Sequence, residues 1–292
     1  MDRLALPSPS KVNLYLEVLG RRDDGFHEIR SIAVLTELCD TIVLKRRPSG
    51  ITVGAEDPQV PSGPENICYR AASVLLRHCS LSAGVSIHIE KRIPIAGGMG
   101  GGSSNAAATL WGLNLLYRLG RPREELMRLG AELGSDVPLF FSRGTAFVSG
   151  RGERVEELPA LSPRWLVIAN PGMEISTASV YRRLRLPLTS EEPGIRMRTL
   201  LESGQEDAAL SYCFNRLEEV VLDAYPAVAA LKQRLSLGGA GPVLVSGSGP
   251  TVFGLVKEAD EAVRLASGLS KTGIRAVACR TLETNPMLVT VQ

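Results

Sequence analysis

The segment from Pro94 to Ser104, PIAGGMGGGSS, carries the clearest chemical signature in the chain, and we call it the glycine loop. Because glycine has no Cβ, its backbone can adopt positive φ, and several N–H groups can then point at one anion. The start of a following helix adds about half a positive charge. A tight strand-to-helix turn is the simpler alternative, but it needs only one or two glycines. The pattern therefore favours phosphate binding.

The glycine loop differs from the common phosphate-binding signatures. A Walker A motif needs GxxxxGK[ST], and no Gly-Lys-Ser or Gly-Lys-Thr occurs in the chain, which excludes a P-loop NTPase. The dinucleotide fingerprint GxGxxG also fails, because its last position falls on Ser103 or Asn105. A nicotinamide oxidoreductase is therefore a weak second choice. Neither the loop nor the later segment VSGSGP holds the GxSxG elbow of a hydrolase nucleophile.

The cysteines and histidines show no spacing typical of a metal site. No CxxC pair occurs, and the histidines have no partner at ligand spacing, so we expect neither a zinc site nor a disulfide framework. We interpret the cysteines as reduced structural thiols. The residues concerned are Cys39, Cys68, Cys79, Cys213, Cys279, His27, His78 and His88.

The elements on either side of the glycine loop must hold it in place. Alternation of Val12, Leu14 and Leu16 predicts a strand over 11–22. Three further runs rich in β-branched residues predict strands over 31–38, 41–47 and 84–95. Apolar residues at helical spacing predict helices over 65–80, 103–119 and 123–134. The loop should thus follow a strand and open a helix.

The composition changes near residue 160, where prolines flank a new apolar strand, Trp165 to Ala169. We therefore predict two domains, 1–160 and 161–292, in keeping with a length of 292 residues. Strands and helices do not alternate strictly, which favours an α+β fold over a doubly wound parallel sheet. In the second half we expect helices over 178–184, 206–237 and 259–270, and strands over 242–249, 251–256 and 274–282.

Charge and hydropathy exclude several other classes. The chain has 33 basic and 31 acidic residues, a net charge of +2, and 44% hydrophobic residues, which is typical of a folded globular protein. The small net charge argues against a nucleic-acid partner. No apolar run of about 18 residues is present, and Pro7 and Pro9 interrupt the start, where a signal peptide needs an apolar core. We expect a cytoplasmic protein that spans no membrane.

Four segments, in order, resemble the GHMP kinases: PSKVNLYLEVLGRRDDGFHE, PIAGGMGGGSSNAA, LGSDVPLFF and VSGSGPTVFGLV. The resemblance implies a two-domain α+β fold with an N-terminal ATP-binding domain, and with ATP and substrate meeting in the cleft between the domains. GRRDDGFHE and LGSDVP narrow it to the branch that phosphorylates the 2-hydroxyl of a cytidine diphosphate-linked methylerythritol, in the non-mevalonate route to isoprenoids. ATP and Mg²⁺ are the implied cofactors.

The resemblance assigns the chemistry to Lys11 and Asp136. Asp136 matches the family's catalytic aspartate, which takes the proton from the substrate hydroxyl. Lys11 matches an active-site lysine that stabilises the charge on the transferring phosphoryl group. Asn13 lies two residues further along the same strand face and matches a substrate-orienting asparagine. Without the resemblance, a turn aspartate and a solvent-facing lysine would be the simpler interpretations.

By the same resemblance, Phe26 and His27 recognise the cytidine end of the substrate, and Tyr181 is a second aromatic residue against the base. An imidazole can both donate to and accept from a pyrimidine edge, and an aromatic face can stack on the ring. The family normally has tyrosine where this chain has Phe26, so a stacking face remains but a hydroxyl is lost. Phe26 and Tyr181 could instead be core aromatics.

The nucleotide is assigned to the glycine loop and to Asn66, which matches a position near the adenine pocket. Asn66 could equally be a polar residue at a helix start. Mg²⁺ keeps several waters and needs few protein ligands, so the sequence does not name them; Ser104 is a candidate. The loop residues assigned to ATP are Pro94, Ile95, Ala96, Gly97, Gly98, Met99, Gly100, Gly101, Gly102, Ser103 and Ser104.

Two other functions remain open on these grounds. Another GHMP kinase, of the homoserine or mevalonate type, would share the glycine loop but lack GRRDDGFHE. A non-catalytic nucleotide- or RNA-binding module could bind phosphate without chemistry. For assembly, a monomer or a weak homodimer is expected, because no heptad pattern is present.

Overall fold

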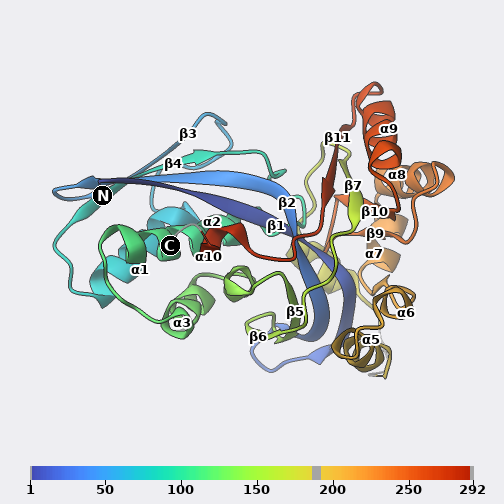
Figure 1. The fold of residues 1–292 in the computed structure, drawn as a ribbon, viewed down its shortest axis with the longest axis horizontal. Helices are drawn as coiled ribbons and strands as arrows, with labels where there is room; N and C mark the ends of the chain where they lie inside the picture. Colours follow the sequence, from blue (N-terminus) through green and yellow to red (C-terminus); the bar gives the residue numbers. More distant parts are fainter. Residues whose placement is uncertain (1, 186–191, 290–292) are drawn as a thin grey trace.

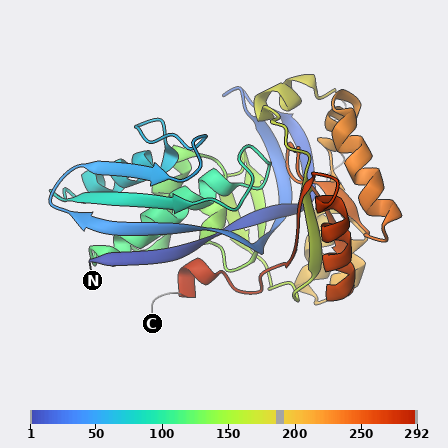
Figure 2. The ribbon, with the colours of Figure 1, turned by 90° about the horizontal axis from the view of Figure 1, so that it is seen from above.

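The computed structural model describes residues 2–185 and 192–289 and has two halves joined by long strands (Figures 1 and 2). A seven-stranded sheet and a four-stranded sheet form their frames. Strands β1 (Arg3–Arg21) and β2 (His27–Arg47) run from one half into the other and pair antiparallel along almost their whole length. The mixture confirms the predicted α+β class.

The larger sheet has the order β3-β4-β2-β1-β8, and β5 and β6 extend it from β2. Strand β2 also pairs with β5 over 29–34 and with β4 over 41–47, so its second neighbour changes along its length. Irregular register near Pro9 and Ser10 marks a bulge in the β1–β2 ladder, which increases the local bend. The remaining strands are β3 (Ile51–Ala55), β4 (Gly84–Glu90), β5 (Thr145–Gly150), β6 (Arg154–Glu157) and β8 (Phe214–Asn215).

Helices cover one face of this sheet in the N-terminal half (Figure 1). Helix α2 (Gly101–Leu116) is buried nearly all round, since Ala106, Ala107 and Ala108 let it lie close to the sheet and to its neighbours. A helix that is apolar on every side is expected to be central. The other covering elements are α1 (Ile67–His78), α3 (Arg123–Leu133), the 3-10 turn η1 (Pro138–Phe141) and α10 (Pro286–Val289).

The C-terminal half is built on an antiparallel sheet of order β11-β7-β10-β9. One face of this sheet packs on the β1–β2 half through Ile168 and Phe253. Helices α8 (Pro226–Leu237) and α9 (Ala259–Ser270) pack against the sheet and share an apolar core with its strands. Its strands are β7 (Trp165–Asn170), β9 (Val243–Val245), β10 (Val252–Val256) and β11 (Arg275–Arg280). Its helices are α4 (Thr177–Arg183), α5 (Glu192–Glu202), α6 (Glu206–Leu210), α7 (Glu218–Ala224), α8 (Pro226–Leu237) and α9 (Ala259–Ser270).

Several predicted elements needed correction. The helix expected over 206–237 is three helices, interrupted where Phe214 and Asn215 pair in parallel with β1. The strands expected over 31–38 and 41–47 are one strand, β2, and the strand expected over 84–95 ends at Glu90. Strand β1 begins at Arg3, before its two prolines. Strands β3, β5 and β6 were not predicted.

Helix α10 packs on the first half of the protein, although it follows the second half in sequence. Its Met287 is fully buried in the same core as α2. The division at residue 160 stays a prediction. In the described part of the chain, no helix has the length and apolar character needed to cross a bilayer.

Candidate active site

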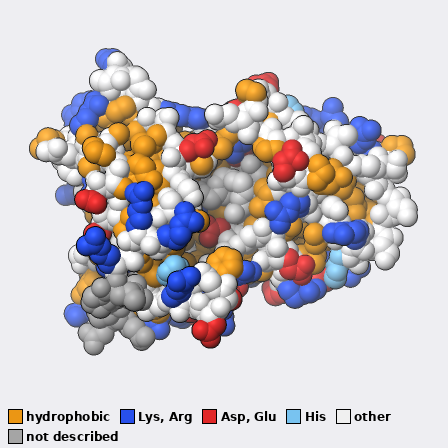
Figure 3. Space-filling model, turned by 180° about the vertical axis from the view of Figure 1, so that it is seen from behind, with side chains coloured by type: hydrophobic (Ala, Val, Ile, Leu, Met, Phe, Trp, Pro, Cys, Tyr) orange, Lys and Arg blue, Asp and Glu red, His pale blue; other side chains and the backbone are white. Residues whose placement is uncertain are grey.

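A cavity of about 1160 Å³ lies between the two halves, and its mouth is the hollow near the middle of the face in Figure 3. Most of the residues selected from the sequence line it. They come from β1, from the start of β2 and the turn before it, from the glycine loop, and from the turn after α3 and helix α4. The lining residues are Lys11, Asn13, Phe26, His27, Asn66, Pro94, Ile95, Ala96, Gly98, Gly100, Gly101, Gly102, Ser103, Asp136 and Tyr181.

Three loop residues do not line the cavity. Gly97 packs closely, since a Cβ there would lie 2.9 Å from the Thr251 hydroxyl. Met99 is buried in the core, and its carbonyl oxygen accepts a hydrogen bond from the Lys11 backbone N–H at 3.0 Å. Ser104 is fully buried, and its hydroxyl accepts a hydrogen bond from Ser8 at 2.7 Å. Met99 and Ser104 therefore support the loop from behind.

The glycine loop runs from the end of β4 to the start of α2, as the sequence predicted. Gly98 and Gly100 have φ of +75° and +70°, a region that favours glycine, and Gly100 is the N-cap of α2. A Cβ on Gly98 would lie 2.2 Å from the Ser246 carbonyl oxygen, so no side chain fits there. The first turn of α2 holds no acidic residue, which leaves its helix dipole free to attract an anion.

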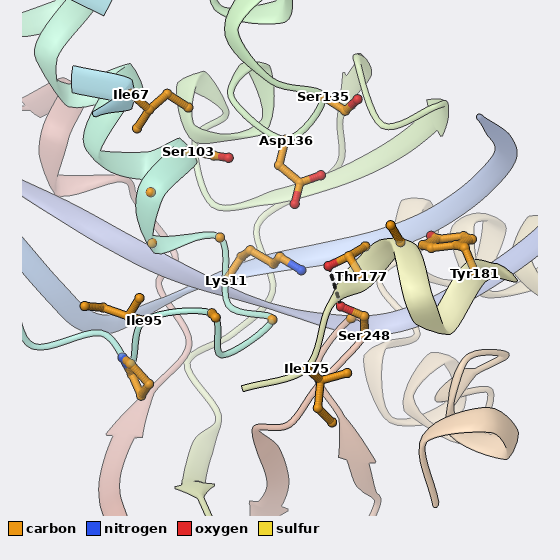
Figure 4. Close-up of a pocket in the computed structure, with 18 of the residues that line it drawn as sticks. Lys11, Ile67, Ile95, Ser103, Ser135, Asp136, Ile175, Thr177, Tyr181 and Ser248 are labelled. Atoms are coloured by element: carbon orange, nitrogen blue, oxygen red, sulfur yellow. Dashed lines mark hydrogen bonds between the residues drawn. The ribbon is translucent and has the colours of Figure 1, made fainter. Parts of the chain in front are cut away.

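The Lys11 ammonium and the Asp136 carboxylate point into the same space, beside the glycine loop (Figure 4). Lys11 is buried, and its Nζ donates a hydrogen bond to Asn13 Oδ1 at 2.6 Å. Burial lowers the pKa of Lys11, because an ammonium loses hydration in the protein interior, and the negative charge of Asp136 opposes that shift. A buried lysine and a carboxylate therefore share one cavity.

Neighbouring residues orient the Asn13 amide toward Lys11 and hold the backbone that carries Asp136. Asn13 also donates from Nδ2 to the Ser31 hydroxyl at 2.7 Å, and Ser31 donates to the Tyr15 carbonyl oxygen at 2.7 Å. This chain orients the Asn13 amide so that its oxygen faces Lys11. Asp136 lies in the turn between α3 and η1, next to Val137, which is fully buried in the core. The backbone that carries the carboxylate is therefore anchored.

Aromatic side chains gather at one end of the cavity. The rings of His27 and Tyr181 lie 4.9 Å apart between centroids, tilted by 34°. Phe26 is 48% exposed, and the Arg151 guanidinium lies 5.0 Å from the centre of its ring. Burial, and then the charge of Arg21, lower the pKa of His27, so its imidazole is neutral at pH 7. A neutral imidazole can donate from one nitrogen and accept at the other.

Asn66 lines the cavity and also has a structural role. It is the N-cap of α1, where Oδ1 accepts from the Cys68 backbone N–H at 2.8 Å and Nδ2 donates to the Pro61 carbonyl oxygen at 2.6 Å. Both ends of its amide are therefore engaged in holding the helix start.

Two polar side chains that were not assigned to the site from the sequence, Thr177 and Ser248, line the cavity and contact each other. Thr177 Oγ1 and Ser248 Oγ lie 2.8 Å apart, across the gap between α4 and the turn before β10. Ser248 belongs to the VSGSGP segment noted above, whose Ser246 donates to the Gly98 carbonyl oxygen at 3.0 Å. That segment therefore packs on the glycine loop. Arg151 was also missed, because only the folded chain brings it to Phe26.

Within residues 2–185 and 192–289, no cluster of three or more His, Cys, Asp or Glu side chains is arranged to hold a metal ion. Burial raises the pKa of four thiols to about 12, so they are poor nucleophiles at neutral pH. These are the thiols of Cys39, Cys68, Cys213 and Cys279.

Comparison with known proteins gives the same picture. Residues 66–144 match the model of the GHMP kinases N terminal domain, and residues 197–275 match the GHMP kinases C terminal model. The chain is 40% identical to a protein of Shouchella clausii named 4-diphosphocytidyl-2-C-methyl-D-erythritol kinase, over 97% of this chain and 96% of that one.

Solved structures agree. A crystal structure of 4-(cytidine 5'-diphospho)-2C-methyl-D-erythritol kinase superposes with a TM-score of 0.81 at 36% identity, covering 96% of this chain and 99% of that one. Homoserine kinase from Cytophaga hutchinsonii gives a TM-score of 0.77 at 16% identity, over 98% of this chain and 96% of that one. The second likeness shows a shared fold only.

Proposed function

The chain belongs to the GHMP kinases, in their 4-diphosphocytidyl-2-C-methyl-D-erythritol kinase family, and we propose that the cavity between its halves carries out that reaction. It is an ATP-dependent small-molecule kinase of the non-mevalonate isoprenoid pathway. The phosphoryl acceptor is the 2-hydroxyl of 4-diphosphocytidyl-2-C-methyl-D-erythritol. The supporting observation is that Lys11 and Asp136, far apart in sequence, lie with the glycine loop in one cavity.

Asp136 acts as the general base of this proposal. Its carboxylate takes the proton of the 2-hydroxyl as that oxygen attacks the γ-phosphorus of ATP. The bond from the γ-phosphorus to the oxygen bridging to the β-phosphate breaks, and ADP leaves with the electron pair. Such transfer depends mainly on placement and electrostatic stabilisation. Proton removal by a positioned carboxylate contributes roughly 10²- to 10⁴-fold in rate.

Lys11 stabilises the charge that develops during transfer. Its ammonium is buried beside Asp136, where a low dielectric strengthens its attraction to phosphoryl oxygens. Asn13 fixes the ammonium through the 2.6 Å hydrogen bond and orients the substrate alcohol. The N–H groups of the glycine loop and the start of α2 hold the ATP phosphates, in a site that neutral backbone groups make favourable for an anion.

The cytidine end of the substrate binds at the aromatic end of the cavity. Phe26 and Tyr181 stack on the base, and His27 presents one donor and one acceptor to its edge. A pyrimidine offers both a ring face for stacking and an edge with hydrogen-bond donors and acceptors. A small substrate such as homoserine has no ring and so offers neither a face nor such an edge. The aromatic end therefore favours the cytidine substrate over those of other GHMP kinases.

Mg²⁺ accompanies ATP in this proposal. The ion prefers oxygen ligands and keeps several waters, so one hydroxyl beside the phosphates fits its needs. Ser103 offers that hydroxyl to the cavity, whereas Ser104 is fully buried and bonded to Ser8. Ser103 would hold the ion together with phosphate oxygens, and the ion would neutralise charge on the β- and γ-phosphates.

The wider setting also follows from the sequence and stays a proposal. The two domains are 1–160, which binds ATP, and 161–292. The enzyme works in the cytoplasm as a monomer or weak homodimer and has no nucleic-acid partner, in keeping with its net charge of +2.

ADP release tests the substrate directly. Purified protein is supplied with ATP, Mg²⁺ and one alcohol at a time: the cytidine diphosphate-linked methylerythritol, homoserine or mevalonate. We expect ADP release with the first alone. Equal or faster release with homoserine or mevalonate, or no release with any alcohol, would contradict the assignment.

A further inference from the structure

A buried carboxylate behind the cavity bonds to the segment that leads into the glycine loop. Asp40 lies on β2, is fully buried, and does not line the cavity. Its Oδ1 accepts hydrogen bonds from two consecutive backbone N–H groups, of Arg92 at 2.7 Å and Ile93 at 2.9 Å. These residues immediately precede the loop.

The other oxygen of Asp40 reaches both sides of the loop. Oδ2 accepts from Lys91 Nζ at 2.5 Å and from Asn105 Nδ2 at 2.9 Å. Lys91 precedes the loop, and Asn105 follows it in helix α2, and both line the cavity. One carboxylate thus ties the two ends of the loop to β2.

Ser8 on β1 extends this set of bonds to the last residue of the loop. Its hydroxyl accepts a hydrogen bond from Asn105 Nδ2 at 2.9 Å and donates to Ser104 Oγ at 2.7 Å. Ser8 is fully buried and does not line the cavity. Ser8 and Asp40 face each other in the β1–β2 ladder, so both strands contribute to the support.

Burial makes this arrangement demanding. A carboxylate inside a protein is costly unless its oxygens are hydrogen-bonded and its charge is balanced. Here four donors, one of which is the Lys91 ammonium, meet both needs. The Lys91 charge also offsets a negative group that would otherwise repel phosphates near the loop. A group so placed serves the loop rather than the substrate.

We propose that Asp40 is a positioning residue that holds the glycine loop in the conformation that binds the ATP phosphates. Asp40 acts through Lys91, Asn105 and the backbone of Arg92 and Ile93. The inference rests on the ATP site proposed above and adds a residue that touches neither ATP nor the cytidine substrate.

Asp40→Asn is the direct test. The amide keeps the shape, and its oxygen can still accept from the two backbone N–H groups, but its NH₂ then faces the Lys91 and Asn105 donors. We expect the KM for ATP to rise by about tenfold or more, while the KM for the cytidine substrate stays within about twofold. A purely structural carboxylate would lower the folded fraction and leave both KM values unchanged, and that result would overturn the proposal.

Glu17→Gln is the matched control. Glu17 is a fully buried carboxylate on β1 that accepts from the Tyr15 hydroxyl at 2.8 Å and does not line the cavity. This variant shows how the two KM values respond when the buried carboxylate that is lost bonds to Tyr15 rather than to residues beside the glycine loop. We expect both KM values within about twofold of the parent protein. A tenfold rise in the ATP KM of this variant would overturn the specific role of Asp40.

Ser8→Ala keeps the test decisive if Asp40→Asn does not accumulate as folded protein. The substitution leaves the carboxylate intact and removes the bonds to Asn105 and Ser104, so we expect a rise of about threefold in the ATP KM. No rise would count against the proposal.

Calorimetric titration with ATP distinguishes a failure of the proposed ATP site from a failure of the proposed role of Asp40. If the parent protein does not bind ATP, the proposed function fails and this inference fails with it. If the parent binds ATP and Asp40→Asn binds it equally well, only the role of Asp40 is wrong.

Discussion

At the scale of single residues, burial lowers the pKa of two side chains that line the cavity, Lys11 and His27. Lost hydration lowers the pKa of Lys11, and the negative charge of Asp136 opposes that shift. At the other end of the cavity, His27 is kept neutral by its surroundings. The cavity therefore has Lys11 and Asp136 at one end and a neutral imidazole among aromatic side chains at the other.

His27 gives the site a predictable pH dependence. Its pKa is lowered, so the imidazole is neutral at and above pH 7 and gains a proton only below its ordinary value of about 6.5. Protonation removes the acceptor nitrogen. We expect the KM for the cytidine substrate to be flat from pH 7 to 8 and to rise as the pH falls below that ordinary value, measured by steady-state kinetics.

The control for this effect is the KM for ATP over the same pH range, which should not follow the titration of His27. His27→Ala should raise the KM for the cytidine substrate at all pH values and abolish its rise at low pH. A variant that keeps the parent's pH profile would show that another group is responsible.

The residue types of the site were predictable, whereas their environments were not. The motifs around Lys11, His27 and Asp136 were enough to select them. Neither the contact of His27 with Tyr181 nor the two bonds of the Asn66 amide could be read from one sequence, because each depends on segments that only folding brings together.

At the scale of elements, the conformation of the glycine loop is constrained by the residues packed against it. Gly98 has φ of +75°, and a Cβ there would meet the Ser246 carbonyl oxygen at 2.2 Å. Gly102 lies in α2 with ordinary helical φ, and the nearest atom to a Cβ would be 3.9 Å away. Gly98 is therefore constrained by its backbone conformation and by a close neighbour, whereas a side chain would fit at Gly102.

Alanine substitutions at these two glycines should shift stability in opposite directions. We expect Gly98→Ala to lower the free energy of unfolding by more than about 2 kcal/mol, through backbone strain and a clash. Gly102→Ala should raise it by up to about 1 kcal/mol, since alanine favours a helix. Urea unfolding measures both, and an equal loss in the two variants would contradict the geometry of the loop.

Substitutions at Asn66 measure how much the cap of α1 contributes to stability. Asn66→Ala removes the acceptor for the Cys68 N–H and should cost about 1 kcal/mol of unfolding free energy. Asn66→Asp keeps an acceptor and should retain most of that stability. Chemical denaturation of both variants is the test, and equal losses would show that the cap contributes little.

The length of the second-half helices shows where local pattern fails. The segment 206–237 has helical spacing throughout, yet Phe214 and Asn215 leave the helix to pair with β1. Asn215 then donates through Nδ2 to the carbonyl oxygens of Val245 and Gly247 at 2.8 Å each. These distant partners override helix propensity at that point, and no periodicity within the segment could reveal them.

At the scale of the whole molecule, the two halves are not independent in sequence. The end of the chain returns to the first half, and Met287 completes the core that holds α2 in place. The cavity takes its walls from both halves, so its geometry depends on how each is held. The class of fold was predictable from composition and the order of elements, but this return of the chain was not.

Met287 should matter for stability although it lies close to the end of the chain. Met287→Ala leaves a cavity in the core and should cost about 2 to 5 kcal/mol of unfolding free energy. Val289→Ala is the matched control, because Val289 is 57% exposed and should change stability by less than about 0.5 kcal/mol. Thermal unfolding of the two variants, if equal, would contradict the buried position of Met287.

The central claim is that Asp136 removes the proton of the substrate alcohol beside Lys11 and the glycine loop, and the kcat of Asp136→Asn tests it most directly. The amide keeps the size of the side chain but cannot act as the base. We predict a loss of about 10²- to 10⁴-fold in kcat, with both KM values within about threefold of the parent protein. A kcat within about threefold of the parent would contradict the account.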